Sequence, residues 1–283
     1  MGATRENGGL PFRRPGGQTE SMTSTRTSPT ADPATDRLLA RFTEELRSVV
    51  QPVAVWAHGS VAAGTDYRPG RSDLDLIAVV ERPCTRQEER KLTAFHRGLE
   101  TAGPLAEKLH CSYVPAAELG DPRCSHLTWA HRELFRRPVT PVTRSELHRF
   151  GLVLAGRPVG ELLPEVTEGQ LREYIVRDLK DYWLPHLDDE KLFHADVWVD
   201  FGMLTLARAV VTLRDGRLIT KAEALGVLAR LGAPAAVVAD VRQRRYADEP
   251  VRASDEWRAR RAELALEFLR PRVRRIAAGH GCV

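Results

Sequence analysis

Hydrophobic and polar positions follow two different periods along this chain, and the period changes about halfway. In the first half, short apolar runs of strand type alternate with helical patterns. Residues 53–57 and 74–80 are apolar and β-prone, and residues 110–114 form a third such run that ends at Pro115. Residues 36–50 and 86–103 carry apolar side chains at helical spacing. These elements predict a small α/β domain with a mixed sheet.

Helical periodicity dominates from about residue 145 onward. Glycine and proline residues divide this half into segments, which is typical of helices joined by short turns. The predicted helices span residues 144–155, 168–184, 195–214, 220–231, 234–247 and 254–277. The predicted fold class is therefore α+β, with a mixed sheet and helices over residues 37–140 and an all-helical region over residues 141–283.

The first 36 residues differ in composition from the rest. They are rich in glycine, proline, serine and threonine and contain few apolar residues, so we expect residues 1–36 to be a disordered tail. Met22 is a candidate for the true start of the protein. The chain has no apolar run typical of a signal peptide or of a membrane span, so no membrane partner is expected.

Charge and cysteine content exclude several classes of function. The net charge is a mild +4, and arginine is mixed with glutamate and aspartate. Four arginines between residues 270 and 275 favour a basic helix end over a nucleic-acid surface, so a nucleic-acid partner is not expected. The four cysteines show no paired spacing, which fits a reducing cytoplasm. Cys124, His126 and His131 lack the spacing typical of a metal cluster.

Two carboxylates at the start of the second predicted strand are the strongest chemical signal. Asp73 and Asp75 are two positions apart, so in a strand their side chains project to the same face. Neighbouring carboxylates repel each other unless a cation lies between them. Carboxylate oxygens are hard ligands, so the pair predicts a divalent metal ion, with Mg²⁺ favoured. The alternative is two solvated aspartates, which the apolar neighbourhood disfavours.

A Gly59-Ser60 turn follows the first predicted strand. Gly59 has no Cβ and lets the backbone approach a ligand, and Ser60 can cap a helix or donate a hydroxyl hydrogen bond. Backbone N–H groups at a helix start attract anions. A phosphate-binding turn beside two metal-binding carboxylates predicts phosphoryl or nucleotidyl transfer from a nucleoside triphosphate.

This ordered set resembles the signature of the nucleotidyltransferase superfamily typified by DNA polymerase beta. Three further segments narrow the resemblance to bacterial aminoglycoside O-adenylyltransferases of the spectinomycin and streptomycin type, over about residues 45–250. The segments are Leu-Val-Leu-Ala-Gly-Arg-Pro at 152–158, Leu-Thr-Leu-Ala-Arg at 204–208 and Arg-Asp-Gly-Arg-Leu-Ile-Thr-Lys-Ala-Glu-Ala at 214–224. The resemblance implies a nucleotidyltransferase domain over 37–140, followed by a helical substrate- and nucleotide-binding domain, with ATP and the acceptor in the cleft between them.

The resemblance also assigns roles to individual residues. It implies that Gly59 and Ser60 form the phosphate turn and that Asp73 and Asp75 hold the metal and are catalytic. It implies nucleotide or phosphate contacts for three residues of the helical region: Arg208, Lys221 and Tyr246. The family places a glutamate, acting as base, in the third strand, where this chain has His110. Three alternatives follow: His110 is the base, because a neutral imidazole accepts a proton near pH 7; or substrate and rate differ from the family; or the enzyme is weakened. Glu107 could substitute only through a bulge.

The function implied is Mg²⁺-dependent transfer of AMP from ATP to a hydroxyl group of an aminoglycoside or aminocyclitol, with release of pyrophosphate, in a cytoplasmic and monomeric enzyme of antibiotic resistance. A polycationic acceptor predicts an acidic pocket, with tryptophans as surfaces for sugar stacking. Two alternatives stay open: transfer to a hydroxyl group of a protein, and nucleotide binding without turnover. Candidates for the acceptor pocket are Asp188, Asp189, Glu190, Asp196, Asp200, Trp183 and Trp198.

Overall fold

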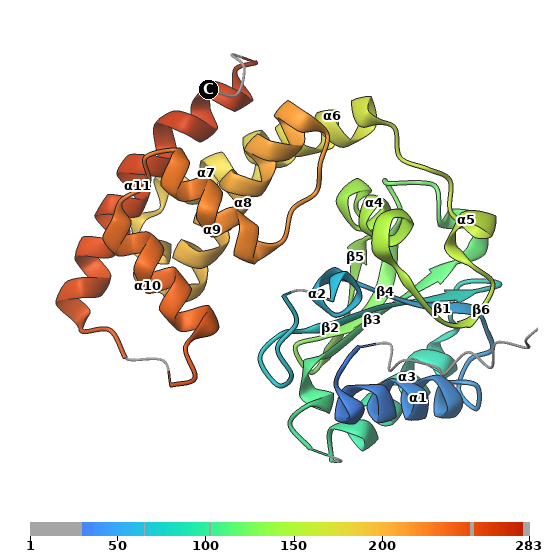
Figure 1. The fold of residues 1–283 in the computed structure, drawn as a ribbon. Coiled ribbons are helices and arrows are strands. Elements are labelled where there is room, and N and C mark those ends of the chain that lie inside the picture. Colours follow the sequence, from blue (N-terminus) through green and yellow to red (C-terminus); the bar gives the residue numbers. More distant parts are fainter. Residues whose placement is uncertain (1–29, 65, 102, 250–251, 280–283) are drawn as a thin grey trace, which may run out of the picture.

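The computed structural model describes residues 30–64, 66–101, 103–249 and 252–279. A sheet with helices on both faces forms the first part, and a group of packed helices forms the second part beside it (Figure 1). This arrangement confirms the predicted α+β fold class. The predicted tail falls mainly on residues 1–29, which lie outside the described residues.

The strands of the described residues form one six-stranded sheet in the order β5-β4-β3-β2-β1-β6. Strands β2 and β3 are parallel, and the other neighbouring strands are antiparallel. The predicted strands are confirmed as the three central ones. The bounds are β1 Pro52–His58, β2 Leu74–Val80, β3 Leu109–Pro115, β4 Ser125–Ala130, β5 Glu133–Pro138 and β6 Leu152–Gly156.

Successive side chains of the central strands point to opposite faces of the sheet, so each face has its own apolar core. On one face, α1 (Pro33–Leu46) and α3 (Arg86–Glu100) cover side chains such as Val55, Leu76 and Tyr113. On the other face, α4 (Pro141–Phe150) and α5 (Val159–Leu162) cover Trp56 and Ile77. The short helix α2 (Gly59–Ala63) follows β1 directly, and the 3₁₀ turns η1 (Ala106–Lys108) and η2 (Ala116–Glu118) flank β3. Because both faces are covered, the central strands are apolar on both sides.

Two local predictions are wrong. The first is the start of the first helix, because α1 begins at Pro33 with Asp32 as its N-cap, not at Asp36. The second is the helix over 144–155, because its second half is strand β6 and pairs with β1. The sheet thus continues past residue 140, where the sequence predicts the helical region. Short apolar runs fit either a strand or a buried helix, and pairing with a neighbouring strand decides between them.

The hairpin of β4 and β5 is an element that the sequence analysis does not contain. The two strands are joined by His131 and Arg132, whose φ angles are 53° and 66°. A two-residue hairpin turn requires such positive φ values and usually places Asn or Gly there. This turn carries neither residue, so the hairpin has no local sequence signal.

The second part packs helices around one apolar core. The remaining helical predictions are confirmed with shifts of a few residues, although the helix that begins at residue 168 continues past Pro185, where a break is expected. In the described part of the chain, no helix is both long enough and apolar enough to span a membrane. The bounds are α6 Glu168–Asp178, the π turn η3 Leu179–Trp183, α7 Leu184–Asp188, η4 Glu190–His194, α8 Asp196–Asp215, α9 Lys221–Arg230, α10 Ala235–Tyr246 and α11 Asp255–Ala277.

A histidine buried in the first core makes the stability of the protein depend on pH. His96 Nε2 lies 2.7 Å from the hydroxyl oxygen of Tyr113, and the His96 ring stacks on Trp129 at 4.8 Å between ring centroids. Burial, with a smaller contribution from the charge of His110, lowers the pKa of His96 from 6.5 to about 3. Below pH 6.5 the unfolded chain therefore binds a proton that the folded protein excludes.

We expect this histidine to contribute stability that is complete above pH 6.5 and is lost as the pH falls towards 3. Between pH 6.5 and pH 5, its share of the loss is about 2 kcal/mol. Urea unfolding of the wild type and of His96→Gln at both pH values measures this share. If the two proteins lose equal stability on acidification, His96 is not the group responsible.

Candidate active site

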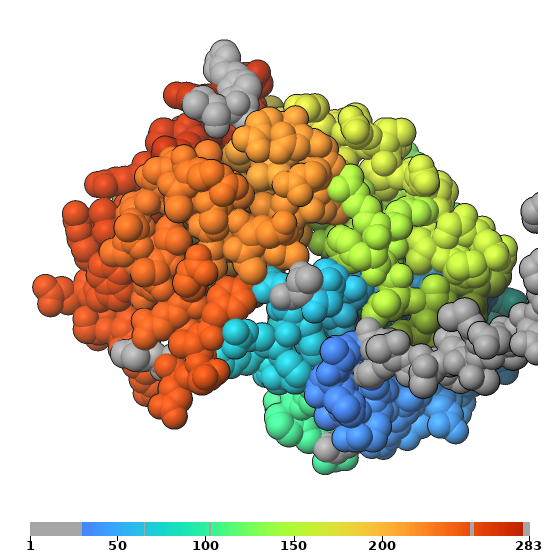
Figure 2. Space-filling view, in the orientation of Figure 1, coloured from blue at the N-terminus to red at the C-terminus, as the bar shows by residue number. Residues whose placement is uncertain are grey.

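A cleft of about 480 Å³ lies between the sheet and the helical part. Figure 2 shows the region as the seam between the helices of the second part, in orange, and residues of the first part, in cyan. Its walls come from segments far apart in the sequence. The first part contributes the end of β1, the turn after it, the start of β2 and α4, and the second part contributes α8 and the start of α9.

The Gly59-Ser60 turn lies at the floor of this cleft. Strand β1 ends at His58, and Gly59 begins α2 with a φ of +69°, which glycine adopts without strain. A Cβ atom on Gly59 would lie 3.0 Å from Oδ2 of Asp75. Glycine at this position therefore lets the turn pack directly against the carboxylate.

The two predicted metal ligands line the same cleft as Ser60. Asp73 directly precedes β2, and Asp75 lies within β2, opposite His58 in the antiparallel register with β1. Burial raises the pKa of Asp75, but a hydrogen bond from His110 and the charges of His58 and His110 outweigh burial and leave the pKa at about 2. Asp75 is therefore ionised at neutral pH and can serve as an anionic ligand.

His110 lies behind Asp75. The parallel register of β2 and β3 pairs the two residues, and His110 Nδ1 is 3.5 Å from Asp75 Oδ1. The side chain of His110 is 6% exposed, and its ring packs edge-on against His131 at 4.8 Å. His110 is not among the residues that line the cleft. Glu107 lies in η1 and pairs with Arg132, so no bulge brings it to the cleft.

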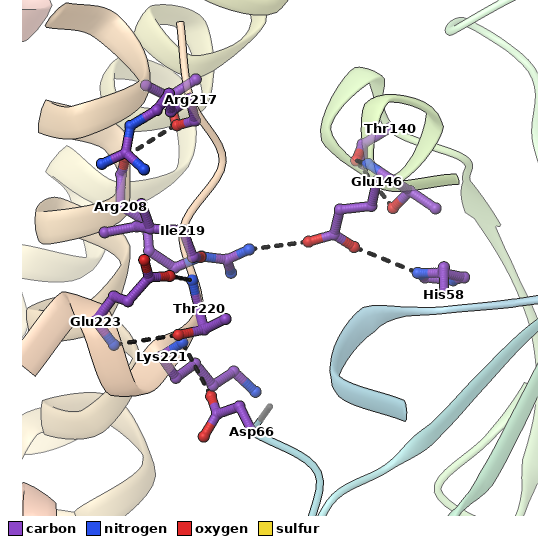
Figure 3. Close-up of polar contacts among 12 residues, drawn as sticks. His58, Asp66, Thr140, Glu146, Arg208, Arg217, Ile219, Thr220, Lys221 and Glu223 are labelled. Carbon is purple, nitrogen blue, oxygen red and sulfur yellow. Dashed lines mark hydrogen bonds and ion pairs between the residues drawn. The ribbon is translucent and has the colours of Figure 1, made fainter. Parts of the chain in front are cut away.

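Two cations reach the cleft from the helical part. Arg208 projects from α8, and Lys221 is the first residue of α9. Arg208 Nε donates to the carbonyl oxygen of Ile219 at 3.0 Å, which fixes the guanidinium beside the start of α9 (Figure 3). Burial lowers the pKa of Lys221, and the positive charges of Arg245 and Arg208 lower it further. Both cations thus face the carboxylates of the first part.

Tyr246 lines a second pocket next to the cleft, and its hydroxyl group links the two parts of the molecule. Its hydroxyl donates to Asp66 Oδ1 at 2.5 Å, and Asp66 Oδ2 accepts from the backbone N–H groups of Lys221 and Ala222 at 3.0 and 3.2 Å. The Arg68 guanidinium lies over the Tyr246 ring at 5.1 Å. Burial, followed by the Asp66 carboxylate, raises the pKa of Tyr246 to about 12. Asp66, which the sequence analysis missed, therefore caps α9 from the first part.

Glu146 is a second cleft residue that the sequence analysis missed. It projects from α4 and lines the cleft, with Oε1 2.9 Å from Arg208 Nη2 and Oε2 3.4 Å from His58 Nδ1. Burial raises the pKa of Glu146, but the hydrogen bond and charge of His58 and the charge of Arg208 give a net lowering. A single glutamate on an amphipathic helix has no spacing signal, so only the fold reveals it.

The acidic residues predicted for an acceptor pocket do not line the cleft. They form ion pairs with arginines of α10 and α11, or cap a helix as Asp189 does. The predicted tryptophans belong to the helical core, where Trp183 is 7% exposed and Trp198 stacks on His186. The pairs are Asp188–Arg274, Glu190–Arg270, Asp196–Arg261 and Asp200–Arg244.

These pairs also explain the basic end of the chain, because Arg270 and Arg274 bind the acidic residues of the α7–η4 segment. Arg272 donates to the backbone of Leu231. Among the described residues, no cluster of three histidine, cysteine or acidic side chains is arranged to hold a metal.

The sheet, the helical region and the cleft between them form an arrangement that a solved adenyltransferase structure also has. The structure is similar to the crystal structure of spectinomycin adenyltransferase AAD(9) from Enterococcus faecialis with ATP and spectinomycin. The TM-score is 0.64 at 17% sequence identity, over 82% of this chain and 98% of that chain. No protein-family model matches the sequence, and no curated protein matches it. The resemblance predicted from the motifs is thus confirmed at the level of the fold.

Proposed function

We propose that the protein transfers AMP from ATP to a hydroxyl group of an aminoglycoside or aminocyclitol, with Mg²⁺ as cofactor and pyrophosphate as the second product. One observation carries the proposal. Ser60, Asp73 and Asp75 from the first part line a single cleft together with Arg208 and Lys221 from the second part. The fold shared with an adenyltransferase whose structure contains ATP and spectinomycin supports the choice of substrates.

Asp73 and Asp75 fit a magnesium ion. Mg²⁺ in proteins is usually held by one or two carboxylates together with substrate phosphates and water, so a third protein ligand is not needed. Both carboxylates line the cleft, and Asp75 is ionised at neutral pH. When bound, Mg²⁺ would neutralise charge that develops on the phosphate oxygens and would help to align the reacting groups.

The chain's own residues bind and orient the triphosphate. Gly59 lets the backbone approach a phosphate closely, and the Ser60 hydroxyl can donate a hydrogen bond to it. Arg208 and Lys221 offer positive charge from the opposite wall, where they stabilise the triphosphate and the departing pyrophosphate. His110 positions Asp75 through the 3.5 Å contact between Nδ1 and Oδ1, and its role as the base stays a prediction.

Incubation with [α-³²P]ATP, Mg²⁺ and a panel of aminoglycoside and aminocyclitol antibiotics tests the proposal. We expect the label to move onto at least one antibiotic. Label on a protein of an added lysate, with none on any antibiotic, would favour the alternative in which the acceptor is a protein hydroxyl. ATP binding without transfer to either acceptor would favour nucleotide binding without turnover.

A further inference from the structure

We infer that Glu146 is an internal competitor of the nucleotide for Arg208. The inference rests on the proposed function, because it takes Arg208 to be a ligand of the triphosphate. In the structure, the guanidinium of Arg208 is bound to a carboxylate: its Nη2 atom lies 2.9 Å from Glu146 Oε1 (Figure 3).

The contact joins the two parts of the molecule across the cleft. Glu146 belongs to α4 of the first part and Arg208 to α8 of the second, and both line the cleft. The Glu146 side chain is 12% exposed and that of Arg208 is 30% exposed, so water screens the pair only partly. A charge-assisted hydrogen bond in such a place is stronger than one at an open surface.

The Glu146 carboxylate and a phosphate group would compete for the same edge of the Arg208 guanidinium. Arg208 Nε is held by the carbonyl oxygen of Ile219 at 3.0 Å, which leaves the Nη groups to bind an anion. A carboxylate and a phosphate offer the same kind of charged oxygen acceptor to this fork. A triphosphate that binds both Nη groups of Arg208 therefore has to displace Glu146 from Nη2.

His58 and Lys221 affect the free energy needed to displace Glu146 from Arg208. Glu146 keeps one partner after displacement, because its other oxygen lies 3.4 Å from Nδ1 of His58 in its own part of the molecule. Lys221 has no such occupant, since no hydrogen bond or ion pair within the described residues involves its ammonium group. Of the two cations proposed to bind phosphate, Arg208 is therefore paired with a carboxylate of the described part of the protein, whereas Lys221 is not.

Isothermal titration of MgATP into wild type and Glu146→Gln tests the inference. The glutamine keeps the size and the hydrogen-bonding ability of the side chain but removes its charge. We expect Glu146→Gln to bind MgATP about tenfold more tightly, which corresponds to about 1.4 kcal/mol. The matched control is Glu161→Gln, whose partner Arg157 is on the exposed surface of the first part, and its affinity for MgATP should equal that of the wild type.

A double-mutant cycle separates competition from a structural effect. Arg208→Gln should weaken MgATP binding, and adding Glu146→Gln to it should change nothing further, because the contested group is gone. Melting temperatures check folding, and Glu146→Ala should shift the affinity in the same direction. If Glu146→Gln binds MgATP no more tightly than a wild type that does bind it, or if its gain persists without Arg208, the inference is overturned while the proposed function stands. A wild type that does not bind MgATP contradicts both.

Discussion

Asp75→Asn is expected to lower the rate of AMP transfer about a thousandfold while the protein stays folded. The change removes the charge of a carboxylate that lines the cleft beside Ser60 and Asp73 and that we propose as a ligand of Mg²⁺. Loss of charge stabilisation by a metal ion is worth several kcal/mol, and about 4 kcal/mol corresponds to a thousandfold in rate. The measurement is the initial rate of labelled-AMP transfer at saturating ATP and Mg²⁺, together with a melting curve.

The control for this substitution is Asp121→Asn. Asp121 pairs with Arg123 in a loop outside the cleft, so the same chemical change there should leave the rate unaltered. A rate for Asp75→Asn within a few-fold of the wild type, in a folded protein, would remove the carboxylate pair from the chemistry.

Arg261→Leu is expected to lower the free energy of unfolding by about 3 kcal/mol. The Arg261 side chain is completely buried, and its Nη atoms lie 2.8 Å from Asp196 Oδ1 and 3.1 Å from Asp240 Oδ2. Leucine fills part of the space, but Asp240 loses one of its arginine partners. Removing one partner of a buried ion pair lowers the free energy of unfolding by more than the intact pair contributes to it, because the remaining charge stays desolvated.

Urea unfolding of the whole chain measures this loss. Arg260→Leu is the matched control, because Arg260 is exposed and pairs with the equally exposed Glu263 at 2.8 Å. Its expected effect is below about 1 kcal/mol. Equal stability of the two variants would mean that the arginine–carboxylate network of α8, α10 and α11 contributes nothing to the fold.

The central part of the fold could be predicted from local patterns. The three central strands are long apolar runs flanked by turn residues, and the helices of the second part carry clear apolar periods. The positions of Gly59, Ser60, Asp73 and Asp75 depend on a single strand–turn–strand segment, so their proximity follows from sequence spacing. Arg208 and Lys221 are far from that segment, and only the family resemblance predicted that they face it.

Other features depend on contacts between distant segments. Strand β6 is a strand because β1 offers it a free edge, and the hairpin of β4 and β5 turns at residues that give no turn signal. Glu146 joins the site because α4 lies over the sheet. The acidic residues near α8 look available in the sequence, yet arginines more than forty positions away pair with them. Such pairings have no local signature.

Transfer from ATP labelled at the α or the γ phosphate tests whether the protein moves AMP to its acceptor. Wild-type protein is incubated with Mg²⁺, an acceptor antibiotic, and either [α-³²P]ATP or [γ-³²P]ATP. We expect the acceptor to carry the α label and the γ label to leave in pyrophosphate. Two results would contradict AMP transfer at this site. The first is an acceptor that carries the γ label. The second is equal labelling of the acceptor by the wild type and by the Asp73→Asn and Asp75→Asn variants.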